Sequence, residues 1–293
     1  MKKVISLLIV LAIVFSLTTS VFAVEANNTT TFAVSSPSFP DAYIITDTTM
    51  ATQNYSGLSG SLGSISATVF IEERYDVVDG ELTVVDSRLL SEEEVLSIGI
   101  ENFDEYVVPT NARAATNSRG RLTITFAGTY SYVGKGVSCK LVGTADWGTG
   151  GIFDSGENVP AMGEDFIGVT WSGGFSSSSH SISGTNHLGG ALKIYESDSL
   201  PNSGRVWSFS DLLILSKYNI SARHIDLNMT ITKNTLEGNG NTAEAVLKYI
   251  HTYSKLGGSI SITPGSENAA GSISLSNTDK QWSLVCTVTN IPY

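Results

Sequence analysis

Apolar and polar residues alternate one by one through much of the second half of the chain. From Leu122 to Tyr132, apolar side chains occupy nearly every second position and threonines take most of the positions between them. Residues 137–147, 223–232 and 282–290 repeat this pattern. A period of two is typical of antiparallel strands with one buried and one solvent-facing side. The sequence therefore predicts a mainly β protein, with an antiparallel β-sandwich of Greek-key or jelly-roll type over residues 121–293.

Further strands are expected in shorter β-rich runs between these segments. They cover residues 165–171, 177–183, 191–196, 205–215, 258–263 and 271–276. Residues 243–255 fit both a helical stripe and a strand, and the surrounding β pattern favours the strand.

The front of the chain has a different pattern. Residues 24–63 are rich in Thr, Ser, Asn and Gly, which indicates a disordered lead-in. Two β-rich runs then meet at Asp79-Gly80, a turn dipeptide that predicts a hairpin. Ser91 followed by Glu94 forms a capping-box pattern that starts a short helix, and Gly99 ends it. We expect a hairpin-helix module at residues 64–108, a linker at 109–120 and the sandwich after it.

The distribution of charge supports this division. Residues 24–110 carry 15 acidic side chains against two arginines, a net charge of −13, whereas residues 111–293 carry 13 of each sign. No basic run is present, which argues against nucleic acid and anionic membrane surfaces as partners.

The first 23 residues have the features of a signal peptide. Lys2 and Lys3 precede an apolar run that is too short to span a bilayer, and Ala23 stands at the expected cleavage position. We expect a secreted, extracellular protein of Gram-positive type with no stable membrane anchor. Arg113, Arg119 and Arg121 lie in or beside the linker. The acidic module is therefore either an ordinary small domain or a pro-region removed by cleavage after one of these arginines.

The two cysteines, Cys139 and Cys286, fall on the apolar sides of their strands. In an exported chain this pattern predicts a disulfide between the start and the end of the sandwich. The alternative is two buried free thiols, and neither arrangement supplies a nucleophile.

A glycine-rich stretch of twelve residues, DWGTGGIFDSGE, partly matches a calcium loop. Asp146, Asp154 and Glu157 take loop positions 1, 9 and 12, and Gly151 takes the turn position. Positions 3 and 5 are glycines, so half of the usual ligands are missing. The stretch is either a plain connection or a weak Ca²⁺ site, and no other cofactor is indicated.

Catalytic motifs are incomplete. The segment around Ser172 has Thr170 where a nucleophile elbow needs glycine. The histidines have no metal-ligand spacing; they are His180, His187, His224 and His251. A pair of carboxylates for sugar hydrolysis depends on spatial separation, and Glu157, Glu164 and Asp165 are the first to examine.

Three functions remain from the sequence. The first is a non-catalytic binding or cell-surface protein, whose Ser/Thr-rich strand faces suit a glycan or cell-wall ligand. The second is a secreted hydrolase with carboxylates assembled in space. The third is a processed, membrane-active β protein that uses residues 175–194 as an inserting hairpin.

Overall fold

The computed structural model describes most of the chain, in segments separated by short gaps. The described residues are 30–53, 58–79, 81–103, 116–148, 163–186, 189–210, 213–214, 218–219, 222–235, 241–253, 258–276 and 278–293.

Two antiparallel sheets form the body of the molecule. The six-stranded sheet has the order β1 (Thr31–Ser35), β18 (Gln281–Pro292), β15 (Thr242–Thr252), β8 (Glu164–Trp171), β11 (Gly204–Ser210) and β10 (Ile194–Leu200). The eight-stranded sheet has the order β2 (Ile44–Thr49), β4 (Ser59–Val78), β6 (Thr116–Val133), β7 (Gly136–Trp147), β14 (Ala222–Lys233) and β9 (Ser176–Asn186). Two further strands, β3 (Thr52–Gln53) and β5 (Glu81–Leu89), also pair with β4.

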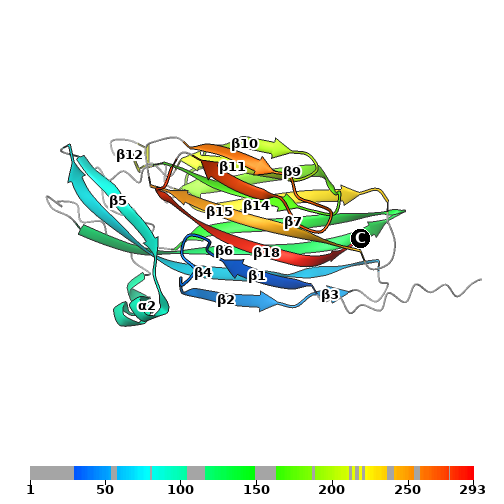
Figure 1. The fold of residues 1–293 in the computed structure, drawn as a ribbon, viewed down its shortest axis with the longest axis horizontal. Helices are drawn as coiled ribbons and strands as arrows, with labels where there is room; N and C mark the ends of the chain where they lie inside the picture. Colours follow the sequence, from blue (N-terminus) through cyan, green and yellow to red (C-terminus); the bar gives the residue numbers. More distant parts are fainter. Residues whose placement is uncertain are drawn as a thin grey trace, which may run out of the picture.

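The sheets pack face to face as a sandwich, with one shared hydrophobic core between them (Figure 1). The alternation seen in the sequence is the reason: in β7 and β14 every second side chain is buried and the intervening ones are at least partly exposed. The sheets come close at Gly143, where an added Cβ would lie 2.8 Å from Leu247 Cδ1 of the opposite sheet. The predicted β-sandwich is confirmed, and residues 242–252 are a strand, as expected.

The outer face of the six-stranded sheet is partly covered. The hairpin of β16 (Ser259–Thr263) and β17 (Ser272–Ser276) packs Ile262, Ile273 and Leu275 on apolar side chains of β8, β11 and β15. Strand β8 is therefore buried on both faces beyond its first residue. A second small pair consists of β12 (Leu213–Ile214) and β13 (Tyr218–Asn219).

The predicted hairpin and helix both form. Asp79, with a φ of 54°, lies between β4 and β5. The helix α2 (Glu92–Ile98) has the complete Ser91–Glu94 capping box and ends at Gly99, and a 3-10 turn, η1 (Ile100–Phe103), follows it. Val95 and Phe103 pack on Phe70, which β4 presents on its outer side, and this contact fixes α2 against the sheet.

The hairpin does not stand apart from the sandwich. Strand β4 pairs with β6 from Ser59–Ser131 to Tyr75–Thr116, so one sheet includes strands of the expected module and of the expected sandwich. Residues 116–120 of the expected linker belong to β6. Residues 31–35 and 44–49 of the expected lead-in are the strands β1 and β2. Both are edge strands, and their Ser and Thr side chains are exposed.

The predicted disulfide is absent, since both cysteines are free and buried. Cys139 lies on β7 between Tyr130 and Ile231, whereas Cys286 lies on β18 between Val34 and Leu247. Each points into the core from a different sheet. Burial raises the pKa of each thiol to about 12. Among the described residues, no helix is long and apolar enough to cross a membrane.

Candidate binding groove on the eight-stranded sheet

The outer face of the eight-stranded sheet carries rows of hydroxyl side chains. These rows arise because the Ser and Thr positions of each strand align in the register of its neighbours. Three of these rows are Ser66, Thr125, Thr144, Asp226 and Ser183; Ser61, Thr129, Lys140, Thr230 and Ser179; and Ser59, Ser131, Ser138, Thr232 and Ser176. The row between the first two contains Ser64, Ala127, Val142, Asn228 and Ser181. Cross-strand hydrogen bonds order part of the face, as between Thr68 Oγ1 and Thr123 Oγ1 at 2.8 Å.

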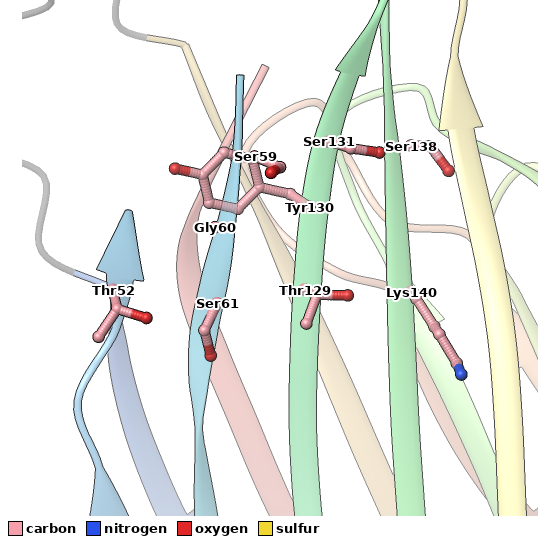
Figure 2. A pocket seen from close by; sticks show the side chains of 9 residues that line it. All are labelled: Thr52, Ser59, Gly60, Ser61, Thr129, Tyr130, Ser131, Ser138 and Lys140. Carbon is pink, nitrogen blue, oxygen red and sulfur yellow. The ribbon is translucent and has the colours of Figure 1, made fainter. Parts of the chain in front are cut away.

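This face is hollowed where β3, β4, β6 and β7 run side by side. The groove has a volume of about 510 Å³, and its lining is mostly hydroxyl-bearing (Figure 2). The lining residues are Thr52, Ser59, Gly60, Ser61, Thr129, Tyr130, Ser131, Ser138 and Lys140. Among these nine, only Lys140 has a basic or acidic side chain.

Two features of β4 shape the groove. The ladder shifts register between Ser61 and Gly63, and Gly63 has a φ of 89°, a conformation that favours glycine. The Gly63 N–H donates to the Ser61 hydroxyl at 2.9 Å, which fixes this bulge. At Gly60 an added Cβ would lie 2.5 Å from the Thr52 carbonyl oxygen and 2.9 Å from the Tyr130 hydroxyl. A side chain at position 60 would therefore displace the groove's own walls.

Exposed apolar side chains lie close to the groove along the chain. Met50, Leu58 and Val133 are 60 to 66% exposed, and each is within two positions of a lining residue. The backbone joins two of these segments, because the Tyr132 N–H donates to the Leu58 carbonyl at 2.7 Å. Apolar and hydroxyl groups are thus available in the same region.

A second hollow of about 390 Å³ lies beside the turn that follows β8. It contains Trp171, Gly173, Gly174, Lys233 and Glu267 among its lining residues. The ammonium of Lys233 donates to the Gly173 carbonyl at 2.8 Å and lies 4.0 Å from the centre of the Tyr293 ring. The side chain of Lys233 thus ties this turn to the end of the chain.

Among the described residues, the two most deeply buried carboxylates do not line either hollow. Asp165 and Glu73 lie on opposite sides of His251, at 3.1 Å from Nδ1 and 3.1 Å from Nε2, and all three are at most 1% exposed. Asp165 also accepts from the Tyr249 hydroxyl at 2.5 Å, and Glu73 accepts from the Tyr75 hydroxyl at 2.7 Å. We call Glu73, His251 and Asp165 the buried triad.

The buried triad joins the two sheets. Asp165 and His251 belong to the six-stranded sheet and Glu73 to the eight-stranded sheet. Burial by itself lowers the pKa of His251, but the charge of Asp165 and the hydrogen bonds to Asp165 and Glu73 outweigh it. The pKa of His251 therefore lies well above its ordinary value of 6.5. The raised pKa favours the protonated imidazole between the two carboxyl groups. The triad is buried, in the position of a structural contact rather than an open site.

The remaining site predictions have varied placements. Asp154 and Glu157 lie outside the described residues, and Asp146 instead contacts His224 at 3.0 Å on the polar face. No group of three or more potential ligands suited to a metal ion occurs among the described residues. Of the three carboxylates named for a hydrolase, Glu164 is exposed and Asp165 is buried, both on β8, and Glu157 lies outside the described residues.

The other predicted positions are held by local contacts. Ser172 is buried, and its hydroxyl accepts from the Glu244 N–H at 2.8 Å. His180 lies 3.5 Å from Glu196 on β10. His187, Ala23 and Arg113 are outside the described residues. Arg119 and Arg121 lie within β6, where Arg119 pairs with Glu72 at 3.0 Å.

Neither the groove nor the triad was predicted from the sequence, but a sequence pattern is associated with each. His251 shares the apolar side of its strand with Leu247 and Tyr249, which is the position of a buried histidine. For the groove, the signal is the Ser/Thr content of the outward positions in β4, β6 and β7, which the alternation already separates from the core.

Comparison with known proteins gives distant structural likeness alone. No protein-family model matches the chain, and none of the curated proteins matches its sequence. Among solved structures, the chain is similar to the N-terminal domain of a Streptococcus gordonii adhesin, with 8% identity, a TM-score of 0.28, and coverage of 85% of this chain and 66% of that one. It is also similar to a backbone pilin of Streptococcus pyogenes, with 10% identity, a TM-score of 0.29, and coverage of 86% and 64%. The chain thus spans just under two thirds of each. The fold described above rests on the strand ladders themselves.

Proposed function

We propose that this protein is a secreted, non-catalytic binding protein that holds a saccharide in the groove of its eight-stranded sheet. The observation that carries the proposal is the groove's lining, in which seven of nine residues bear a hydroxyl group. Serine and threonine hydroxyls both donate and accept hydrogen bonds, as sugar hydroxyls do. A ligand covered in hydroxyl groups can therefore pair with this surface without leaving either side unsatisfied.

The exposed apolar side chains near the groove support the same class of ligand. A sugar ring has hydroxyl groups at its edge and C–H groups on its faces, so it contacts polar and apolar surfaces together. Met50, Leu58 and Val133 are exposed and lie within two positions of a lining residue along the chain. The hollow's width across four strands suits an extended chain of sugars better than one small molecule.

The alternative of a hydrolase has less support from the described residues. A glycosidase needs two carboxylates flanking the substrate. No carboxylate lines the groove, and the closely placed pair Glu73 and Asp165 is buried in the core. We therefore expect binding without turnover.

A binding panel tests the proposal. The secreted chain is mixed with insoluble cell walls and with soluble neutral and charged polysaccharides, and the bound fraction is measured by co-sedimentation and calorimetry. Ser131→Ala with Ser138→Ala removes two groove hydroxyls and should weaken binding by about tenfold, since each hydrogen bond contributes about 0.5–1.5 kcal/mol.

A matched variant provides the control. Ser181→Ala with Ser183→Ala removes two exposed hydroxyls from β9, away from the groove on the same sheet. This variant should bind as the unmodified chain does. Equal loss in both variants, or no binding to any saccharide of the panel, would contradict the proposed function.

A further inference from the structure

The single basic side chain of the groove narrows the class of saccharide, an inference that rests on the proposed function. Lys140 is exposed on β7, between Thr129 of β6 and Thr230 of β14 in the ladder. Ser138 lies two residues earlier on the same face and also lines the groove. Figure 2 shows the Lys140 side chain directed away from Ser138, so its neighbours across the ladder are Thr129 and Thr230. An ammonium group beside threonine hydroxyls can hold an anion by charge and by hydrogen bonds together.

The acidic residues on β7 and β14 lie at a distance from Lys140. Asp47 of β2 and Glu72 of β4 belong to the same sheet, but they align with Ser66 and Arg119, in rows that do not line the groove. Along β7, Asp146 is six residues from Lys140, which corresponds to about 20 Å at the rise of a strand. Asp226 aligns with Thr144, four residues or about 13 Å from Lys140. Both separations exceed the screening length of about 8 Å at physiological ionic strength. These carboxylates therefore do not neutralise the charge of Lys140.

Because the chain is negatively charged overall, it can bind an anionic ligand only close to a cationic side chain. The net formal charge of −11 repels anionic polymers in general. An anionic ligand is favoured only where a local cation and suitable donors occur together. In the groove, that place is the neighbourhood of Lys140.

We propose that the groove prefers saccharides that carry an anionic substituent, either a carboxylate or a phosphate group, and that Lys140 binds this substituent. The hydroxyl groups of Thr129 and Thr230, its ladder neighbours, are available to donate to the same anion. The hydroxyl rows on β4 and β6 bind the neighbouring sugar units. Lys140 thus selects among saccharides that the remaining lining residues accept.

Three polymers of equal length test this preference: plain dextran, carboxymethyl dextran and dextran phosphate. Calorimetry with the secreted chain at 0.15 M salt should show tighter binding of both anionic polymers than of plain dextran. Lys140→Gln should weaken the binding of the anionic polymers by about fivefold, the scale of one exposed ion pair. The affinity for plain dextran should change by less than about twofold. Lys193→Gln, at an exposed lysine outside the groove, is the control and should change neither.

The outcomes separate this inference from the proposed function. Equal binding of plain and anionic dextrans, or equal effects of the Lys140 and Lys193 variants, overturns the preference for an anion and leaves saccharide binding in place. Binding of none of the three polymers counts against both. Tighter binding of one anionic polymer than the other supports the inference and identifies the preferred anion.

Discussion

Replacing His251 by leucine should destabilise the protein more than any substitution on its surface. The change removes the cation and both N–H donors from between Asp165 and Glu73, while the two carboxylates stay buried at 1% exposure or less. Removing one partner from a buried ion pair costs about 3–5 kcal/mol, because the remaining charge is left uncompensated. The Tyr249 hydroxyl still donates to Asp165 and the Tyr75 hydroxyl still donates to Glu73. The loss in free energy of unfolding should therefore stay within this range.

Urea unfolding at pH 6.5 measures this loss in free energy directly. At the same pH, the melting temperature should fall by about 6–20 °C, given about 2–4 °C per kcal/mol for a domain of this size. A companion variant, His251→Leu with Glu73→Gln and Asp165→Asn, removes the buried charges together and should recover part of the stability.

The pH dependence provides an independent check of the charge on His251. Its folded-state pKa is raised above the unfolded value of about 6.5. The stabilisation by the imidazolium is therefore complete below about pH 6.5 and is lost as the pH rises through the folded pKa. Between pH 6 and 9 the unmodified chain should lose stability relative to His251→Leu, so the difference between them narrows. A His251→Leu variant within 1 kcal/mol of the unmodified chain at pH 6.5, or a constant difference across this range, would refute the reasoning.

Three further predictions concern the core, the thiols and the front of the chain. Gly168→Ala should destabilise by about 1–3 kcal/mol, since the new Cβ would lie 2.5 Å from Ile273 Cδ1 and 2.7 Å from the Arg205 carbonyl oxygen; unchanged urea unfolding would contradict this packing. Iodoacetamide at pH 8 should label neither cysteine in the native protein, because burial raises the pKa of both thiols to about 12. It should label both after unfolding without reductant, because both thiols are free. A mass that shows no labelling after unfolding would indicate a disulfide. A cut after Arg113 should leave the two fragments together on a sizing column until urea is added, because β4 pairs with β6 and β1 pairs with β18; an acidic fragment that elutes alone would favour removal as a pro-region.

Local patterns predicted the elements well. The period of two, the Asp79-Gly80 turn and the Ser91–Glu94 capping box depend on neighbouring residues, so the sequence contains the information directly. The sequence also placed both cysteines correctly on buried sides of their strands. It did not show that these sides belong to different sheets, because each inner face of a sandwich has the same apolar pattern.

Long-range pairing accounts for what the sequence left undetermined. Strands β1 and β2 have Ser/Thr-rich composition, which resembles a disordered segment until their partners β18 and β4 are known. The contact between Glu73 and His251 joins residues 178 positions apart, and no local pattern indicates it. The groove likewise needs the register of β4, β6 and β7, which places Ser61, Thr129 and Lys140 in one row.

The most direct test of saccharide binding is amide NMR of the secreted chain during titration with the polysaccharide that binds best in the panel. We predict that the largest shifts occur in residues 59–61, 129–131, 138 and 140, which line the groove. Residues near the buried triad should change little. Shifts centred on β9 or on the hollow beside Lys233, or the absence of shifts, would contradict binding in the groove.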